Sequence, residues 1–145
     1  DNGPPEMLKA LPALWAGILY DPESLEAAYV LIRDWTNGER EYLRENAPRD
    51  GLQTPFRQGS VQDLAKAILA LAEAGLKRRR VLNARDEDES IYLAPLHAIA
   101  ASGVTQAQRL VAAYSAEWNG NIAGVFNACA FRSAKKTAKT PKARP

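Results

Sequence analysis

The stretch that decides the fold is Met7-Leu-Lys-Ala-Leu-Pro-Ala-Leu-Trp-Ala-Gly-Ile-Leu-Tyr20, which is apolar at almost every position. A helix that is apolar on every side is a buried helix, so this segment predicts a central element of the core. Pro12 has no amide hydrogen to donate, and it predicts either a first-turn position or a kink. The residues that follow are therefore expected to supply the helices that cover this one.

Capping signals downstream mark where those helices begin. Asp21-Pro22-Glu23 combines an N-cap acceptor, a proline preset for the first turn and an acid that the helix dipole favours. Thr36 with Glu39 is a capping box that predicts a short charged helix ending before Pro48. Residues 48–59 predict a loop pinned by Phe56, and further helices are expected over residues 60–80, 92–101, 105–118 and 122–131.

Apolar residues recur at helical spacing within several of these segments, and each stripe predicts a buried face. No stretch alternates apolar and polar residues for long, so strands are expected to be absent or minor. The chain thus predicts an all-α fold, a bundle of about six helices. The predicted stripes are Leu25, Ala28, Tyr29, Ile32 and Trp35; Leu64, Ala67, Ile68, Leu71 and Leu76; and Leu110, Ala113 and Tyr114.

Charge divides the 145 residues into two parts. Six of the 19 Lys and Arg residues follow Phe131 with no acid among them, which leaves 13 basic against 17 acidic residues in the body. Residues 1–131 are therefore expected to form the helical region, and residues 132–145 a disordered basic tail. A mildly acidic body argues against nucleic-acid binding, because such a domain normally carries a concentrated positive surface.

Cysteine use and hydropathy bear on the compartment. Cys129 is the only cysteine, so no intrachain disulfide can form. No apolar run approaches about 18 residues, and the first residues lack the order of a signal peptide. These features predict a cytoplasmic protein without a membrane segment. The start at Asp1 rather than at Met suggests a fragment of a longer protein.

Local chemistry is sparse. The single histidine, His97, is expected to be an ordinary helix residue, and Cys129 a buried structural thiol, because nothing basic adjoins it before Arg132. No phosphate-binding glycine loop is present, the Asp86–Glu89 run is expected to be a solvated turn, and the Lys77–Arg80 run a helix end dressed with cations. No catalytic or metal-binding residue is assigned.

One stretch carries a long and specific resemblance. Residues 10–21 resemble the Ala-Leu-Pro-Ala-Phe/Leu-Trp-Val-Gly-Leu-Leu-Tyr-Asp motif of plant and proteobacterial glutamate-cysteine ligases. Lys9 stands where plant members carry a cysteine, which argues against a redox switch of the plant kind. The resemblance covers about residues 1–131, and its other matching segments are Asp34-Trp35-Thr36, Glu39-Arg40, Gly51-Leu52-Gln53-Thr54-Pro55-Phe56-Arg57, Ala74-Gly75-Leu76-Lys77-Arg78-Arg79, Ala101-Ser102-Gly103-Val104-Thr105, Tyr114, Glu117-Trp118 and Val125-Phe126.

The resemblance implies the helical C-terminal part of an ATP-dependent ligase in the first step of glutathione biosynthesis. In the family, ATP phosphorylates the glutamate side-chain carboxylate, and the cysteine amine then attacks the acyl phosphate. ATP and Mg²⁺ are held by an upstream catalytic sheet, so this part alone is expected to bind neither and to be inactive. The one site residue carried over is Trp15, whose indole is expected to help wall the glutamate pocket.

The residues leave other interpretations open. Trp15 and Trp118 suit a core as well as a pocket, since tryptophans in apolar helices are often buried. An independent helical adaptor would have a self-sufficient core. A binder of nucleic acid or acidic surfaces would act through residues 132–145 and lose affinity steeply with salt. A ligase fragment predicts instead a large apolar face left uncovered.

Overall fold

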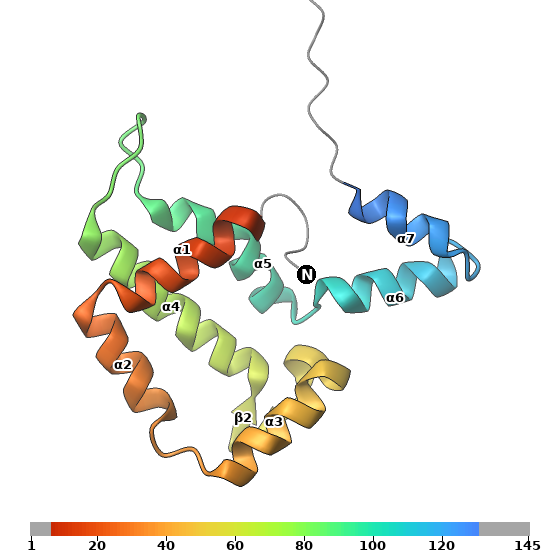
Figure 1. Ribbon diagram of the computed structural model, residues 1–145, viewed down its shortest axis with the longest axis horizontal. Coiled ribbons are helices and arrows are strands. Elements are labelled where there is room, and N and C mark those ends of the chain that lie inside the picture. The colour runs from red at the N-terminus through yellow and green to blue at the C-terminus, as the bar shows by residue number, and fades with distance from the viewer. Residues whose placement is uncertain (1–6, 131–145) are drawn as a thin grey trace, which may run out of the picture.

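The computed structural model describes residues 7–130, and this part is almost entirely helical (Figure 1). The predicted all-α fold is confirmed, with seven α-helices in the described range. They are α1 (Met7–Leu19), α2 (Pro22–Ile32), α3 (Asn37–Asp50), α4 (Val61–Arg79), α5 (Ala94–Ser102), α6 (Gln106–Ala116) and α7 (Ile122–Cys129). Two 3₁₀ turns, η1 (Gly51–Gln53) and η2 (Glu89–Leu93), precede the hairpin and α5, respectively. The strands β1 (Pro55–Phe56) and β2 (Gly59–Ser60) pair antiparallel as that small hairpin.

The predicted helix starts at Asp21, Thr36, Ser60 and Thr105 are confirmed, whereas the helix predicted over residues 92–101 begins as η2 at Glu89 and continues as α5 from Ala94. The Asp21 carboxylate accepts the Ser24 amide at 2.8 Å, and Pro22 occupies the first turn of α2. Complete capping boxes begin α3 at Thr36, α4 at Ser60 and α6 at Thr105. Each box satisfies two amides that a helix start would otherwise leave without a partner.

One predicted helix end is wrong. α3 does not stop before Pro48 but continues through it to Asp50, and the Gly51 amide closes the helix on the Ala47 carbonyl. Pro48 removes a single hydrogen bond, the one to the Arg44 carbonyl. Arg44 is exposed and α3 has no buried residue, so water can replace that bond and a slight bend disturbs no packing.

The core lies where α1 crosses α4. Gly17 and Gly75 bring the two backbones together, and a methyl group at Gly75 would overlap the Gly17 carbonyl oxygen. The Ser24 hydroxyl, buried at the start of α2, donates to the Leu71 carbonyl at 2.8 Å. The buried apolar residues around this crossing are Ala13, Ile18, Ala72, Leu76 and Leu93.

Two predicted stripes are rotated from the buried faces. On α2, Leu25 and Tyr29 are exposed, and the fully buried residue is Ser24. On α4, Ala67 is exposed, and Leu76 is the only member of the predicted stripe that is fully buried. The buried residues of α4 are Leu69, Ala72, Gly75 and Leu76. The helices approach through small side chains, so the larger apolar residues lie beside the contacts rather than within them.

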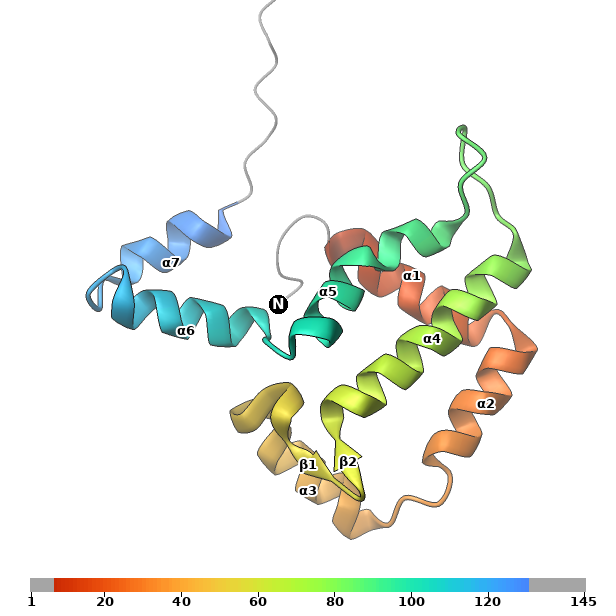
Figure 2. The ribbon, with the colours of Figure 1, turned by 180° about the vertical axis from the view of Figure 1, so that it is seen from behind.

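α6 and α7 form an arm that extends away from the other helices (Figures 1 and 2). Neither helix has a buried residue, so the buried face predicted from Leu110, Ala113 and Tyr114 is wrong. The prediction for Cys129 is also wrong, because its thiol is exposed. An apolar run is not buried when only one short helix lies against it.

The boundary at residue 131 and the tail of residues 132–145 fall outside the described residues, so those two predictions are not tested. Within residues 7–130, no helix has the length and hydropathy needed to cross a bilayer.

Candidate functional site

The first candidate surface is the outer face of α1. Leu8, Trp15 and Leu19 are exposed, and their spacing of seven and four residues places them on one side of the helix. Ala10, Ala13 and Gly17 are buried on the opposite side. We call Leu8, Trp15 and Leu19 the α1 strip. The prediction that α1 is buried all round is therefore wrong for half of its surface.

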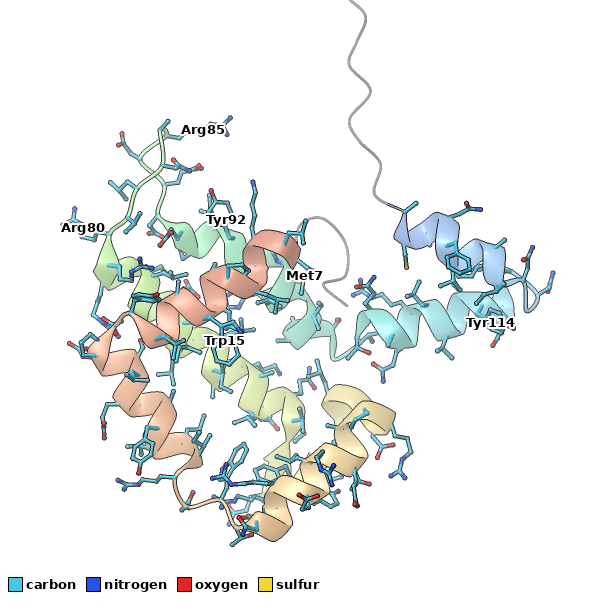
Figure 3. The ribbon with its side chains drawn as sticks, in the orientation of Figure 1. Met7, Trp15, Arg80, Arg85, Tyr92 and Tyr114 are labelled. Carbon is cyan, nitrogen blue, oxygen red and sulfur yellow. The ribbon has the colours of Figure 1, made fainter. Side chains whose placement is uncertain are left out.

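Trp15 is the predicted substrate residue, and it is 57% exposed. Figure 3 labels it on α1. Within the described residues Trp15 is therefore not a core residue, so the interpretation of this tryptophan as part of the core is wrong. Its role at a glutamate pocket stays a prediction. Trp118 differs, because its ring packs directly against Gly124, where a methyl group would overlap it. Trp118 thus has a structural task in holding α7 on α6.

An ion pair joins the turn that follows α1 to the end of α4. Arg78, near the end of α4, donates to both carboxylate oxygens of Asp21 and, at 2.9 Å, to the Ser24 hydroxyl. The hydrogen bond from Arg78 holds the pKa of Asp21 well below its ordinary value. Asp21 therefore caps α2 and anchors α4 at once. Arg79 pairs with Glu89 at 3.0 Å and Lys77 with Glu73, so three members of the cationic run have internal partners, as a helix end dressed with cations predicts.

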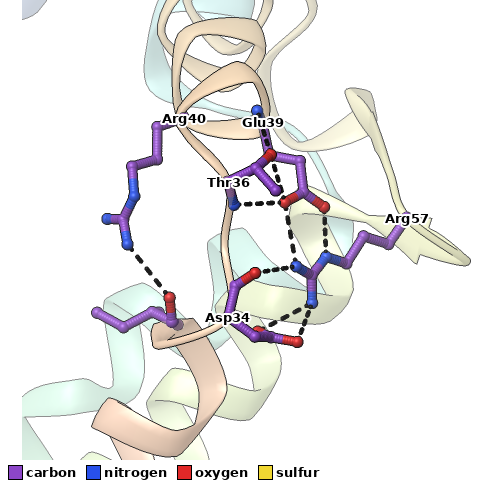
Figure 4. Close-up of polar contacts among 6 residues, drawn as sticks. Asp34, Thr36, Glu39, Arg40 and Arg57 are labelled. Carbon is purple, nitrogen blue, oxygen red and sulfur yellow. Dashed lines mark hydrogen bonds and ion pairs between the residues drawn. The ribbon is translucent and has the colours of Figure 1, made fainter.

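A second cluster surrounds Arg57 at the tip of the hairpin (Figure 4). Its Nε donates to Glu39 Oε1 at 2.6 Å, and its Nη1 donates to both carboxylate oxygens of Asp34 at 3.1 Å. Nη2 donates to the Asp34 carbonyl and to Glu39 Oε2. Arg57 thus joins the end of α2, the start of α3 and the hairpin. Sequence analysis missed this cluster, since its members lie 18 and 23 residues from Arg57.

Electrostatics make the Arg57 cluster a structural link. The hydrogen bond from Arg57 lowers the pKa of Glu39 to about 2, and the same contacts raise the pKa of Arg57. All three guanidinium nitrogens donate to partners within the chain. A phosphate would have to displace two carboxylates from this guanidinium, so the cluster is poorly suited to bind nucleotide.

The contacts of Phe56 confirm that this residue pins the loop. The Phe56 ring meets the Trp35 ring edge to face with centroids 4.9 Å apart, and Arg57 lies over Phe56. A hollow of about 270 Å³ lies beside this pair, between the hairpin, α2 and α4, and its walls include Leu31, Leu64 and Ala67. Its polar neighbours Ser60 and Asp63 are already engaged in the capping box of α4.

The remaining titratable residues do not converge. His97 lies 3.3 Å from Glu73, in keeping with a partly exposed helix histidine. In the predicted solvated turn, Asp88 caps η2 and Glu87 accepts from Asn83. Among residues 7–130, no group of three histidine, cysteine or acidic side chains could hold a metal ion. The described residues therefore do not fit a Mg²⁺ site.

The fold and its surfaces define an all-α segment whose exposed apolar residues gather on helix faces. The chain belongs to the glutamate-cysteine ligase family 2 (GCS2), whose model matches residues 1–128. It is 46% identical over 126 residues to glutamate–cysteine ligase A, chloroplastic, of Oryza sativa subsp. indica, covering 87% of this chain and 24% of that protein. It is 42% identical over 126 residues to the chloroplastic glutamate–cysteine ligase of Arabidopsis thaliana, covering 87% of this chain and 23% of the relative.

The chain spans about a quarter of the length of the curated relatives that it matches. These relatives are chloroplastic enzymes, and this finding overturns the prediction of a cytoplasmic location.

Proposed function

We propose that this chain is the helical supporting part of an ATP-dependent glutamate-cysteine ligase, and that Trp15 forms part of the wall of its glutamate pocket. In such a ligase the γ-carboxylate of glutamate is activated as an acyl phosphate, and the cysteine amine then displaces the phosphate. ATP and Mg²⁺ would be held by the rest of the ligase, since residues 7–130 offer no cluster of acidic ligands. Glutamate and cysteine would be the substrates.

The observation that carries the proposal is the exposure of the α1 strip within the motif of residues 10–21. Burying a tryptophan removes a large apolar area from water, so exposing one is costly unless something covers it. Trp15 is 57% exposed here, whereas Ala13 and Gly17 on the opposite side are packed against the core. A helix with this distribution suits a wall that faces another part of the protein.

The role proposed for Trp15 needs no titratable group. An indole beside the substrate would pack against the methylene groups of glutamate and exclude water from the acyl phosphate. The Asp21–Arg78 pair and the Gly17–Gly75 contact would position the indole by fixing α1 on α4. No proton transfer or phosphate contact is assigned to these residues.

The test is the steady-state kinetics of the complete ligase with Trp15→Ala, with coupled detection of ADP. Loss of the apolar wall should raise the KM for glutamate at least several-fold, because binding in both the ground state and the transition state is weakened. Trp15→Phe should restore part of the affinity. The KM for ATP should change less.

Tyr42→Ala is the matched control, because Tyr42 is also an exposed aromatic residue but lies on α3. It should leave the KM for glutamate unchanged. An unchanged KM for glutamate in Trp15→Ala would remove Trp15 from the pocket, and a complete ligase with no turnover of glutamate and cysteine would refute the proposed activity.

A further inference from the structure

The α6–α7 arm exposes several large apolar side chains. Val111 is 66% exposed, Ile122 58% and Phe126 71%. Ile122, Phe126 and Cys129 follow one another at steps of four and three residues, so they line one side of α7. The arm therefore presents a continuous apolar stripe on α7 and a further exposed apolar residue on α6.

Packing within the arm does not account for its stability. Helices of 11 and eight residues are marginal in water without a packed face, and neither α6 nor α7 has a buried residue. One internal contact is the Trp118 ring against Gly124. A two-helix hairpin of this kind needs a further surface to cover its apolar residues.

We propose that the α6–α7 arm is a clasp that docks, through Phe126, Ile122 and Val111, onto an apolar surface of the remainder of the ligase. This inference rests on the proposed function, because it takes the covering surface from the other three quarters of the enzyme. The family match includes the arm through residue 128, and the curated relatives are about four times as long as the matched segment.

Two further features fit that partner. The start of α1, at Met7, is the end of that helix nearer the arm (Figure 3). The arm carries only Arg109 and Glu117 as charged residues between positions 106 and 129. Its recognition must therefore rest on apolar contact rather than on charge steering.

Hydrogen exchange on the complete ligase tests the clasp. If the arm is docked, the amides of residues 106–129 should be protected, and Phe126→Ser should speed their exchange by about tenfold or more. Because Phe126 is exposed within this chain, the substitution leaves the core around Leu76 intact. Tyr42→Ser, at an exposed aromatic residue of α3, is the control and should not change exchange in the arm.

Three outcomes of the hydrogen-exchange experiment would overturn the clasp. Arm amides that exchange at the rate of an unstructured peptide, or protection that Phe126→Ser leaves unchanged, would overturn the clasp. Protection that fades on dilution, as the measured mass falls from dimer to monomer, would assign the surface to a second copy and overturn it too. The activity of the same preparation is a separate readout: an active ligase with an unprotected arm refutes only the clasp, and a protected arm in a protein without ligase activity refutes only the proposed function.

Discussion

Replacing Gly75 with alanine should weaken the whole fold, because this glycine sets the distance between α1 and α4. The new methyl group would overlap the Gly17 carbonyl oxygen and lie 2.9 Å from both the Gly17 carbonyl carbon and the Ser24 hydroxyl. Two of these atoms belong to the backbone of α1, so the helices must separate. Separation also strains the hydrogen bond from Ser24 to the Leu71 carbonyl.

The expected cost follows from these contacts. Overpacking a core costs about 1–3 kcal/mol, and the rigid carbonyl at Gly17 places this case at the upper end. Loss of a buried hydrogen bond adds about 1 kcal/mol. Alanine regains about 1 kcal/mol of helix propensity, which leaves a net loss of about 3 kcal/mol. For a chain of this size, that lowers Tm by roughly 6–12 °C.

Thermal unfolding followed by circular dichroism measures this loss, and Gly38→Ala is the matched control. Gly38 lies in α3, and the nearest atom to a methyl group there is the Thr36 hydroxyl oxygen at 4.0 Å. Gly38→Ala should therefore raise Tm slightly, through the reduced entropy of the unfolded chain. A Gly75→Ala variant that unfolds at the wild-type temperature would show that the α1–α4 crossing is not close-packed. An equal decrease of Tm in both variants would show that the loss does not come from the Gly17–Gly75 contact.

Three further predictions concern charge and exposure. Arg57 lowers the pKa of Glu39 to about 2, so the stability that Glu39 contributes is complete above about pH 4.5 and is lost as the pH falls toward 2. Glu39→Gln should therefore make the free energy of unfolding less sensitive to acid, as measured by urea unfolding at a series of pH values. Asp21→Asn should lower Tm near neutral pH by removing the carboxylate that accepts the hydrogen bonds of Arg78, and a Tm equal to wild type would mean that the pair contributes nothing. Cys129 should react with a thiol reagent in the native 145-residue chain as fast as in the unfolded one, and strong protection there would contradict its exposure.

The parts of the fold that depend on neighbouring residues could be read from the sequence. The capping boxes at Thr36, Ser60 and Thr105 act over three residues, and all three helix starts are correct. Gly103 also closes α5 in a left-handed conformation, as a glycine after a helix predicts. Local hydrogen bonding decides these positions before any tertiary contact does.

The buried faces could not be read in the same way. Hydrophobic periodicity gives weight to large residues, such as Leu25 and Tyr29, whereas the closest contacts in this fold use Ser24, Ala72 and Gly75. Small residues carry little hydrophobic signal, although they allow backbones to approach. The Arg57 cluster was missed for a related reason, because it depends on a positive φ of 52° at Arg57 and on partners far along the chain.

The wrong prediction that α1 is buried on every side supports the proposed function. Its sequence is apolar on all sides, a pattern that would be costly in a helix with one face permanently in water. Within residues 7–130 that face is nevertheless open at Leu8, Trp15 and Leu19. The pattern and the exposure are compatible if α1 is covered twice, once by α4 and once by a part of the ligase beyond this chain. An independent adaptor would have no reason to keep the outer face apolar, so the α1 strip favours a ligase part over an adaptor.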